Sequence, residues 1–112
     1  MKRDPDLDLS TLEEMVLSVL LGGELYGLAI IKAIEEATDG KRHVGFGSLY
    51  PTLHQLEKRG MVKSNWGNET PSERSRARRR YYTITGIGQA ALNEAEALRG
   101  SLMQWSQAFG RE

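Results

Sequence analysis

The residues of this sequence that are best suited to chemistry are five arginines within the eight residues from 73 to 80. A guanidinium group is planar, donates paired hydrogen bonds and stays protonated at working pH, so it suits the oxygens of phosphate. Alternate side chains of an extended segment point the same way, so Arg74, Arg76 and Arg78 can line one face, with Arg79 beside them. The run indicates a phosphate-binding surface, and the alternative is a solvated loop that only keeps the protein soluble.

A second candidate surface is the outer face of residues 48–59. Leu49, Leu53 and Leu56 form a narrow apolar stripe at helical spacing, which turns the polar side chains outward. The outer face and its flanks comprise Ser48, Tyr50, Thr52, His54, Gln55, Lys58 and Arg59. A helix in the major groove of DNA places such groups against base edges and phosphates. Every surface helix is polar outside, so this pattern gains its weight from the arginine run that follows it.

Metal binding and catalysis find little support. His54 and Glu57 stand three positions apart, which is a ligand spacing in some helical bundles, but no second pair completes the set. The glycines at 45 and 47 lack the lysine of a P-loop and the surroundings of a dinucleotide site, so we expect them only to let the chain turn. Because there is also no cysteine and no nucleophile elbow, we expect no metal site, no cofactor and no enzymatic activity.

Length and charge bound the possibilities further. A chain of 112 residues with 39% apolar residues forms a single domain. The net charge is zero, yet residues 41–80 carry ten Lys and Arg against three acidic residues, whereas residues 1–40 carry three against nine. This basic module agrees with a phosphate-rich partner. The longest apolar stretch falls far short of the roughly 20 residues a bilayer needs, and the N-terminus lacks a signal-peptide pattern, so we expect a cytoplasmic protein without a membrane partner.

Capping signals and apolar spacing predict three helices, then two strands and a last helix. The expected ranges are 11–21, 26–38 and 48–59 for the helices, 61–66 and 80–84 for the strands, and about 25 residues after Thr85 for the last helix. Ser10 and Glu13 form a capping box before the first helix, and Pro51 fits the first turn of the third. This order predicts a mainly helical α+β fold, a winged helix-turn-helix with one appended C-terminal helix.

The last helix carries more apolar surface than a small domain can cover. Its apolar side chains recur every three or four positions, at Leu92, Ala95, Leu98, Leu102, Trp105 and Phe109. We expect this stripe to meet Leu12 and Val16 of a second copy, because soluble monomers avoid such a patch. The domain organisation is then a flexible tail over 1–9, a DNA-binding domain over 10–84 and a dimerisation helix over 85–112. Packing is expected for Trp105, with stacking on a flat ligand in a dimer cavity as the alternative.

Three motifs resemble those of PadR-type transcriptional regulators. Residues 48–62, with the sequence SLYPTLHQLEKRGMV, are similar to the recognition-helix signature of that family. Tyr26-Gly27 and residues 79–88, RRYYTITGIG, are similar to its other two marks, and the likeness runs from Leu12 to about Leu98. The resemblance implies a dimeric winged-helix repressor that presents two recognition helices to a palindromic operator. It also implies that Ser48, Tyr50, Pro51, Thr52 and His54 face DNA, while the wing holds phosphate or the minor groove.

This chain resembles the short members of the family, which bear a single C-terminal helix. Its wing loop, residues 68–79, is long and rich in arginine, and in length and wing it loosely resembles the cyanobacterial period-extending branch. Some members of the family sense phenolic acids or drugs. The place of the drug-binding tryptophan of the family is taken here by Arg99 rather than by Trp105.

Two functions from different classes remain open at this point. The first is a homodimeric repressor of transcription that binds double-stranded DNA and responds, in a compatible variant, to a small planar effector. The second is a protein-interaction module that uses the same frame and its arginine loop to hold an acidic partner. The two differ in whether the protein prefers one DNA sequence over others.

Overall fold

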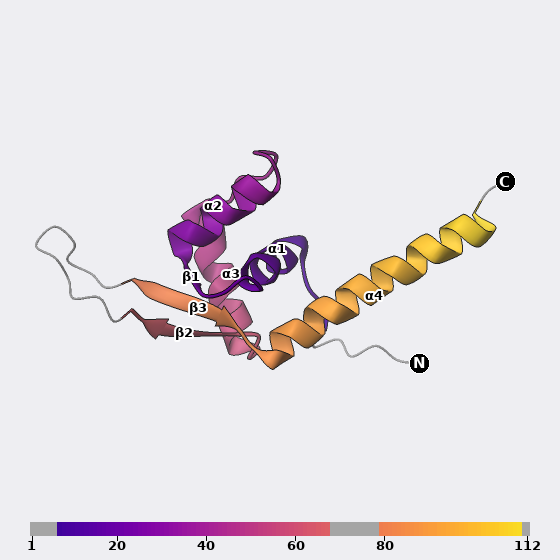
Figure 1. Ribbon diagram of the computed structural model, residues 1–112. Helices are drawn as coiled ribbons and strands as arrows, with labels where there is room; N and C mark the ends of the chain where they lie inside the picture. Colours follow the sequence, from indigo (N-terminus) through magenta and orange to yellow (C-terminus); the bar gives the residue numbers. More distant parts are fainter. Residues whose placement is uncertain (1–6, 68–78, 111–112) are drawn as a thin grey trace, which may run out of the picture.

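The computed structural model describes residues 7–67 and 79–110, so Arg74, Arg76 and Arg78 lie outside the described residues. The elements are α1 (Thr11–Leu20), β1 (Leu25–Tyr26), α2 (Gly27–Ala37), α3 (Phe46–Lys58), β2 (Val62–Trp66), β3 (Arg80–Ile84) and α4 (Gly86–Phe109). Three short helices stand against a small sheet, and α4 extends away from them (Figure 1). The predicted α+β winged helix-turn-helix with one appended helix is therefore confirmed.

Local capping determines where the first and last helices begin. The Ser10 hydroxyl accepts from the Glu13 amide at 3.1 Å, and the Glu13 carboxylate accepts from the Ser10 amide at 2.8 Å. The predicted capping box is thus present. Thr85 caps α4 by accepting from the Gly88 amide, and its own hydroxyl donates to the Gly60 carbonyl at 2.6 Å. This second bond ties the start of α4 to the end of α3.

The sheet has the strand order β1-β3-β2, and both pairs are antiparallel. Val62 pairs with Ile84 and Trp66 with Arg80, and the ladder extends through the Gly67 amide to the Arg79 carbonyl. The strands β2 and β3, with the chain between them, form the wing. The sequence prediction missed β1, whose two residues pair with the central strand β3.

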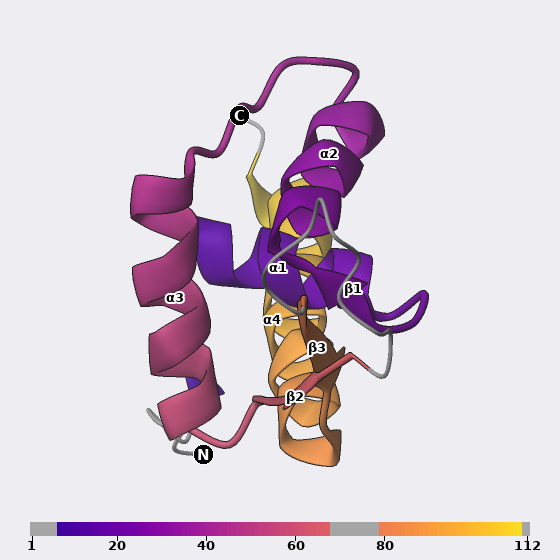
Figure 2. The same cartoon turned by 90° about the vertical axis from the view of Figure 1, so that its left-hand side faces the viewer.

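The core lies where α1, α2 and α3 meet each other and the sheet (Figure 2). The stripe Leu49, Leu53 and Leu56 of α3 is fully buried there, as predicted for its inner face. Leu7 and Leu9 are partly buried against this core, so the packed chain begins before the boundary expected at residue 10. The predicted helix boundaries also shift, since α3 starts at Phe46 rather than Ser48, and α2 starts at Gly27.

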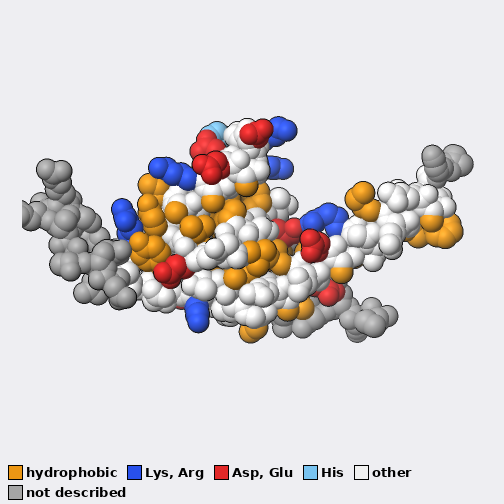
Figure 3. Space-filling model, viewed as in Figure 1, with side chains coloured by type: hydrophobic (Ala, Val, Ile, Leu, Met, Phe, Trp, Pro, Cys, Tyr) orange, Lys and Arg blue, Asp and Glu red, His pale blue; other side chains and the backbone are white. Residues whose placement is uncertain are grey.

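The helix α4 divides into a packed half and an exposed half. Gly88 lies so close to the Met61 carbonyl and the Ile84 side chain that a methyl group there would clash with both. Ala91 and Ala95 are buried, whereas every residue from 96 to 109 is exposed. Figure 3 shows apolar side chains at the far end of this helix, away from the rest of the molecule. The exposed half of α4 therefore has an apolar surface that the described chain leaves uncovered.

Candidate nucleic-acid interface

The outer face of α3 presents most of the residues expected there. Six predicted positions are exposed: Ser48, Tyr50, Pro51, His54, Gln55 and Lys58. Thr52 is half-buried, and its hydroxyl donates to the Ser48 carbonyl at 2.9 Å. This bond satisfies the hydroxyl hydrogen within the helix and leaves the oxygen lone pairs of Thr52 as acceptors. The face thus combines hydroxyl, amide, imidazole and ammonium groups on one rigid element.

An aromatic pair marks the N-terminal half of that helix. The rings of Phe46 and Tyr50 stack with their centroids 5.6 Å apart and an interplanar angle of 13°. Tyr50 extends toward the first turn of α2, where a methyl group on Gly27 would overlap the Tyr50 hydroxyl. A larger residue at position 27 would therefore require the Tyr50 ring to move.

Arg59 does not belong to the outer face, and its predicted outward placement is wrong. Its guanidinium lies 3.2 Å from the Glu13 carboxylate and donates to the Asp8 carbonyl at 2.6 Å. Only 22% of the side chain is exposed. Arg59 therefore joins the end of α3 to the start of α1 and contributes to the fold rather than to a DNA surface.

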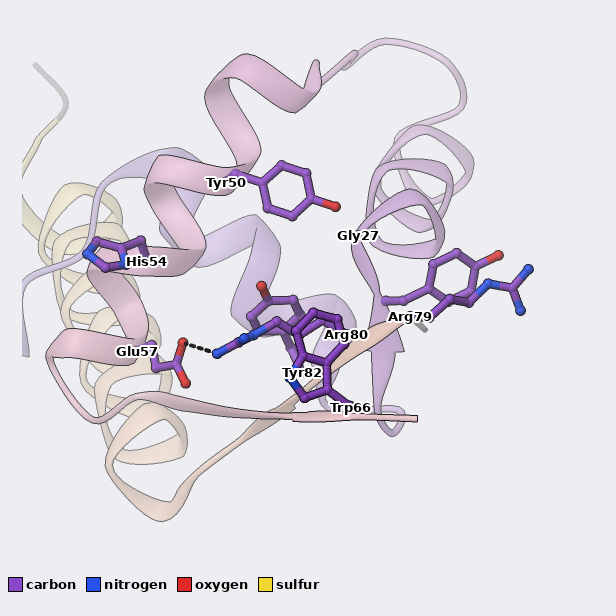
Figure 4. A pocket seen from close by; sticks show the side chains of 9 residues that line it. Gly27, Tyr50, His54, Glu57, Trp66, Arg79, Arg80 and Tyr82 are labelled. Atoms are coloured by element: carbon purple, nitrogen blue, oxygen red, sulfur yellow. Dashed lines mark ion pairs between the residues drawn. The ribbon is translucent and has the colours of Figure 1, made fainter. Parts of the chain in front are cut away.

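A groove of about 810 Å³ separates α3 from the base of the wing. Its lining, shown in part in Figure 4, comes from α2, α3, the strands and the residues that join them: Tyr26, Gly27, Tyr50, His54, Glu57, Trp66, Arg79, Arg80 and Tyr82. We call it the wing groove. The Arg79 guanidinium lies 4.6 Å from the Tyr26 ring centroid, which is a cation–π contact. Of the predicted wing arginines, Arg79 is the one within the described residues, and it lies in this groove.

Three polar side chains, two of which line the wing groove, form a network between α3 and the strands of the wing. The Ser64 hydroxyl donates to Glu57 Oε2 at 2.7 Å, and the Arg80 Nε–H donates to Ser64 Oγ at 3.0 Å. The Arg80 guanidinium also forms an ion pair with Glu57 Oε1 at 3.7 Å and lies 5.3 Å from the Trp66 ring centroid. The network joins α3 to both strands of the wing.

Tyr82 forms the floor of the same groove. Its burial raises the pKa of the phenol above its ordinary value of 10.0, and this effect outweighs the positive charge of Arg80, which acts in the opposite direction. The hydroxyl therefore remains protonated at neutral pH and can donate a hydrogen bond.

The sequence did not predict that Glu57, Ser64, Trp66 and Arg80 belong to one site. The ladder explains how they meet, because Ser64 is opposite Tyr82 and Trp66 is opposite Arg80 in adjacent strands. The alternation of β2 could have placed Ser64 and Trp66 on one face, but their approach to α3 depends on the tertiary fold. His54 and Glu57, considered above as a metal-ligand pair, differ in role because Glu57 accepts a hydrogen bond from Ser64 and forms an ion pair with Arg80. Residues 7–67 and 79–110 contain no group of three or more side chains suited to holding a metal.

The predicted dimer residues divide into buried and exposed sets. Val16 is fully buried in its own chain, so it cannot belong to the interface as predicted. Ala95 is also buried, and Leu12 and Leu92 are half-buried. The exposed set consists of Leu98, Leu102, Trp105 and Phe109. The last two rings are neighbours, with centroids 5.8 Å apart. Arg99 forms an ion pair with Glu14 of α1.

Comparison with known proteins identifies the family. The model of the transcriptional regulator PadR-like family matches residues 16–94, which include α2, α3 and both strands of the wing. The chain belongs to the PadR-like family of transcriptional regulators. PadR-family proteins are DNA-binding winged-helix regulators and not enzymes, which confirms those two predictions.

Solved structures of PadR-family regulators and related transcriptional regulators agree with this assignment. A transcriptional regulator from Clostridium thermocellum is 30% identical, with a TM-score of 0.73, over 89% of this chain and 93% of that chain. A PadR-like transcription factor from Bacteroides fragilis is 29% identical, with a TM-score of 0.73, over 87% of each chain. A PadR-family regulator from Eggerthella lenta is 31% identical, with a TM-score of 0.68, over 88% of this chain and 80% of that chain. The likeness therefore covers most of this chain and most of each of these solved structures.

Proposed function

We propose that this PadR-family regulator is a homodimeric repressor that binds a palindromic operator through α3 and the wing. One observation carries the proposal. The outer face of α3 exposes six of the predicted DNA-facing residues, while the opposite face of the same helix is fully buried. A helix held in this way can enter the major groove without losing its own packing. Base contacts from Thr52, His54 and Gln55 would then select the sequence, because their side chains offer donors and acceptors to base edges.

Phosphate contacts would supply most of the affinity. Arg79, which lines the wing groove, and Lys58, at the end of α3, are both exposed cations. Arg74, Arg76 and Arg78 lie outside the described residues, and we propose that they extend this contact along the DNA backbone or into the minor groove. Lys41 and Arg42, which were not among the predicted residues, are exposed in the segment that joins α2 to α3 and are two further candidate cations.

The C-terminal helix would provide the second half of the dimer. The exposed Leu98, Leu102, Trp105 and Phe109 would pack on a second copy, with Leu12 and Leu92 at the edge of the contact. Residues 85–112 would then be the dimerisation helix, as predicted from the sequence. The DNA-binding domain, predicted over 10–84, would also include Leu7 and Leu9, which pack against its core. A two-fold axis would place the two α3 helices about 34 Å apart, one turn of duplex.

The deciding experiment is selection of DNA fragments from the source genome by the purified full chain at two salt concentrations. An inverted repeat recovered at both concentrations supports the proposal and identifies the regulated promoter. Binding that falls steeply with salt and shows no preferred sequence contradicts it, and then favours the acidic-partner module. The matched variants are His54→Ala, expected to change the preferred operator, and Arg79→Ala, expected to lower the salt slope by about one unit at every sequence.

Repression and dimerisation need their own measurements. Sedimentation at micromolar concentration should give twice the chain mass, and a monomer there would contradict the dimer. A reporter gene placed behind the recovered operator should be expressed less when the regulator is present, whereas increased expression would indicate an activator.

An effector and a location complete the proposal. A small planar effector would bind beside Trp105 in the dimer and quench its fluorescence, and Trp105→Phe should remove that signal if the site is there.

Regulators of transcription act where the chromosome is, so we propose a cytoplasmic location. Over the two described stretches of the chain, none of the helices combines the length and the apolar character needed to span a bilayer.

A further inference from the structure

The network of Glu57, Ser64 and Arg80 in the wing groove is not accounted for by the function proposed above. Glu57 is an acidic residue on the face that approaches DNA, where it would be expected only to repel phosphate. Instead its carboxylate faces Arg80, as Figure 4 shows, with Ser64 bonded to both. A carboxylate that faces an arginine in this manner fixes the direction of the guanidinium, as outer-shell partners do for metal ligands.

Arg80 is held on three sides and remains accessible on another. Its Nε–H is bonded to Ser64, its guanidinium contacts the Trp66 ring, and its ion pair with Glu57 spans 3.7 Å, which is too long for a hydrogen bond. Its side chain is 43% exposed. A phosphate oxygen can therefore reach the guanidinium without breaking the bond to Ser64.

We infer that Arg80 binds one backbone phosphate of the bound duplex and that Glu57 is its positioning residue, acting partly through Ser64. This inference rests on the proposed DNA-binding function and names one contact within it. Both atoms of the ion pair belong to rigid elements, Glu57 to α3 and Arg80 to β3, so the contact also fixes the wing against the recognition helix. An arginine that is already ordered loses little side-chain entropy when phosphate binds.

The inference makes a prediction whose sign is opposite to that of simple electrostatics. If Glu57 only repels DNA, removing its charge raises the affinity. If it positions Arg80, then Glu57→Ala and Glu57→Gln each lower the affinity, by about threefold, because the ion pair is partly solvated. Arg80→Ala should weaken binding about tenfold and lower the salt slope by about one unit. Ser64→Ala should resemble Glu57→Gln.

The test is a double-mutant cycle in the full chain, with duplex affinity measured at several salt concentrations. In the Arg80→Ala background no guanidinium remains to be positioned, so the two Glu57 variants should now raise the affinity. Glu36→Ala is the matched control, because Glu36 is an exposed acidic residue on α2 outside the wing groove. It should change the affinity by the same small factor in both backgrounds. The change of sign on going from one background to the other does not depend on small losses of stability.

The outcomes separate this inference from the repressor proposal when operator and unrelated duplexes are both measured. Glu57 variants that bind more tightly in both backgrounds overturn the positioning role, even if an operator is found. The expected change of sign on unrelated duplex, with no operator recovered, supports the positioning role and contradicts the repressor. No binding to any duplex overturns both. An arginine-detected NMR spectrum of the free protein should show a slowly exchanging Arg80 Nε–H that Ser64→Ala removes, and a fast-exchanging signal in the native protein contradicts the inferred geometry.

Discussion

The helices α3 and α4 carry similar apolar stripes, but these stripes differ in how far the rest of the chain covers them. In α3 the stripe is covered within the chain, with Leu53 only 1% exposed. In α4 the stripe is covered over its first half by the rest of the domain, and then continues into solvent, where Leu102 is 62% and Trp105 60% exposed. Figure 2 shows α3 lying along the domain, and Figure 1 shows α4 projecting from it.

This difference shows which apolar surfaces are buried within a single chain and which remain exposed. The buried stripe of α3 leaves its polar side free to meet another molecule without any loss of packing. The second half of α4 differs, because the surface it exposes to another molecule is apolar rather than polar. Spacing along the sequence shows a stripe in both helices, but only the fold shows whether it is covered.

The largest expected effect comes from the covered stripe. Leu53→Ala should lower the free energy of unfolding by about 3 kcal/mol, because it leaves a cavity among tightly packed side chains. Leu102→Ala removes the same atoms from the exposed half of α4 and should change the unfolding of the isolated chain by less than about 0.5 kcal/mol. Urea denaturation at low protein concentration measures both. Equal losses would contradict the comparison.

A charge in the exposed stripe should act on assembly instead. Leu102→Glu should raise the dissociation constant of the proposed dimer by about 100-fold, since each copy would bury an unpaired carboxylate. The circular dichroism spectrum of the monomer should remain native, and sedimentation equilibrium gives the constant. Glu96→Gln, on the same helix, is the control and should leave the mass unchanged. A Leu102→Glu protein that stays dimeric would place the interface elsewhere.

Two glycines of α4 test the boundary between its halves. Gly88→Ala should destabilise the protein by about 2 kcal/mol or more, because the new methyl group meets the Met61 backbone and the Ile84 side chain. Gly100→Ala meets no heavy atom within 4 Å and should stabilise the helix by up to about 1 kcal/mol. Thermal unfolding of both variants gives the two signs. Destabilisation by Gly100→Ala would show that α4 is also closely packed there, as in a dimer that needs a small residue.

Lys58 and Arg59 are neighbouring cations at the end of α3, and we expect one to bind DNA and the other to stabilise the fold. Arg59→Ala should cost about 1 kcal/mol of stability, through the lost contacts to Glu13 and Asp8, and leave the salt slope of DNA binding unchanged. Lys58→Ala should do the opposite, with little effect on stability and a slope lower by about one unit. Denaturation and salt-dependent binding on the same two proteins make the comparison. If both variants changed stability and the salt slope alike, Arg59 would belong to the DNA-binding surface after all.

Local signals in the sequence were sufficient for most of the fold. The capping box at Ser10, the cap at Thr85 and the alternation over residues 80–84 each act within a few positions, so they could be recognised without knowing the fold. The strand β1 could not, because its two residues are a strand only through their pairing with β3. Its sequence carries no alternation of its own.

The candidate site was predicted where helical spacing decides and missed where distant residues meet. The exposed side of α3 followed from its leucines, but Arg59 was placed outward because Glu13, 46 positions away, attracts it only in the folded chain. The prediction that Val16 lies in the dimer interface was wrong for a related reason. The spacing of apolar residues in α1 does not show which of them the core of the same chain covers. The Glu57–Ser64–Arg80 network depends on the register of β2 against β3 and on the approach of both strands to α3.

The smallest expected effect tests how complete the core is beneath the wing groove. Tyr82 is buried beside α3, and its pKa in the folded protein is raised above the ordinary value of 10.0 because burial disfavours the charged phenolate. The folded state therefore binds the proton more strongly than the unfolded state does. This contribution to stability is fully present below pH 10 and is lost as the pH rises through the folded pKa.

The variant Tyr82→Phe has no phenol to ionise and should show no such loss. The difference in unfolding free energy between the native protein and the variant should therefore be constant from pH 7 to about pH 9. At about pH 10 and above it should shift in favour of the variant. Urea denaturation across that range measures it. A difference that stays constant to pH 11 would mean that water reaches the hydroxyl, and that the core beneath the groove is open where the buried stripe of α3 indicates that it is closed.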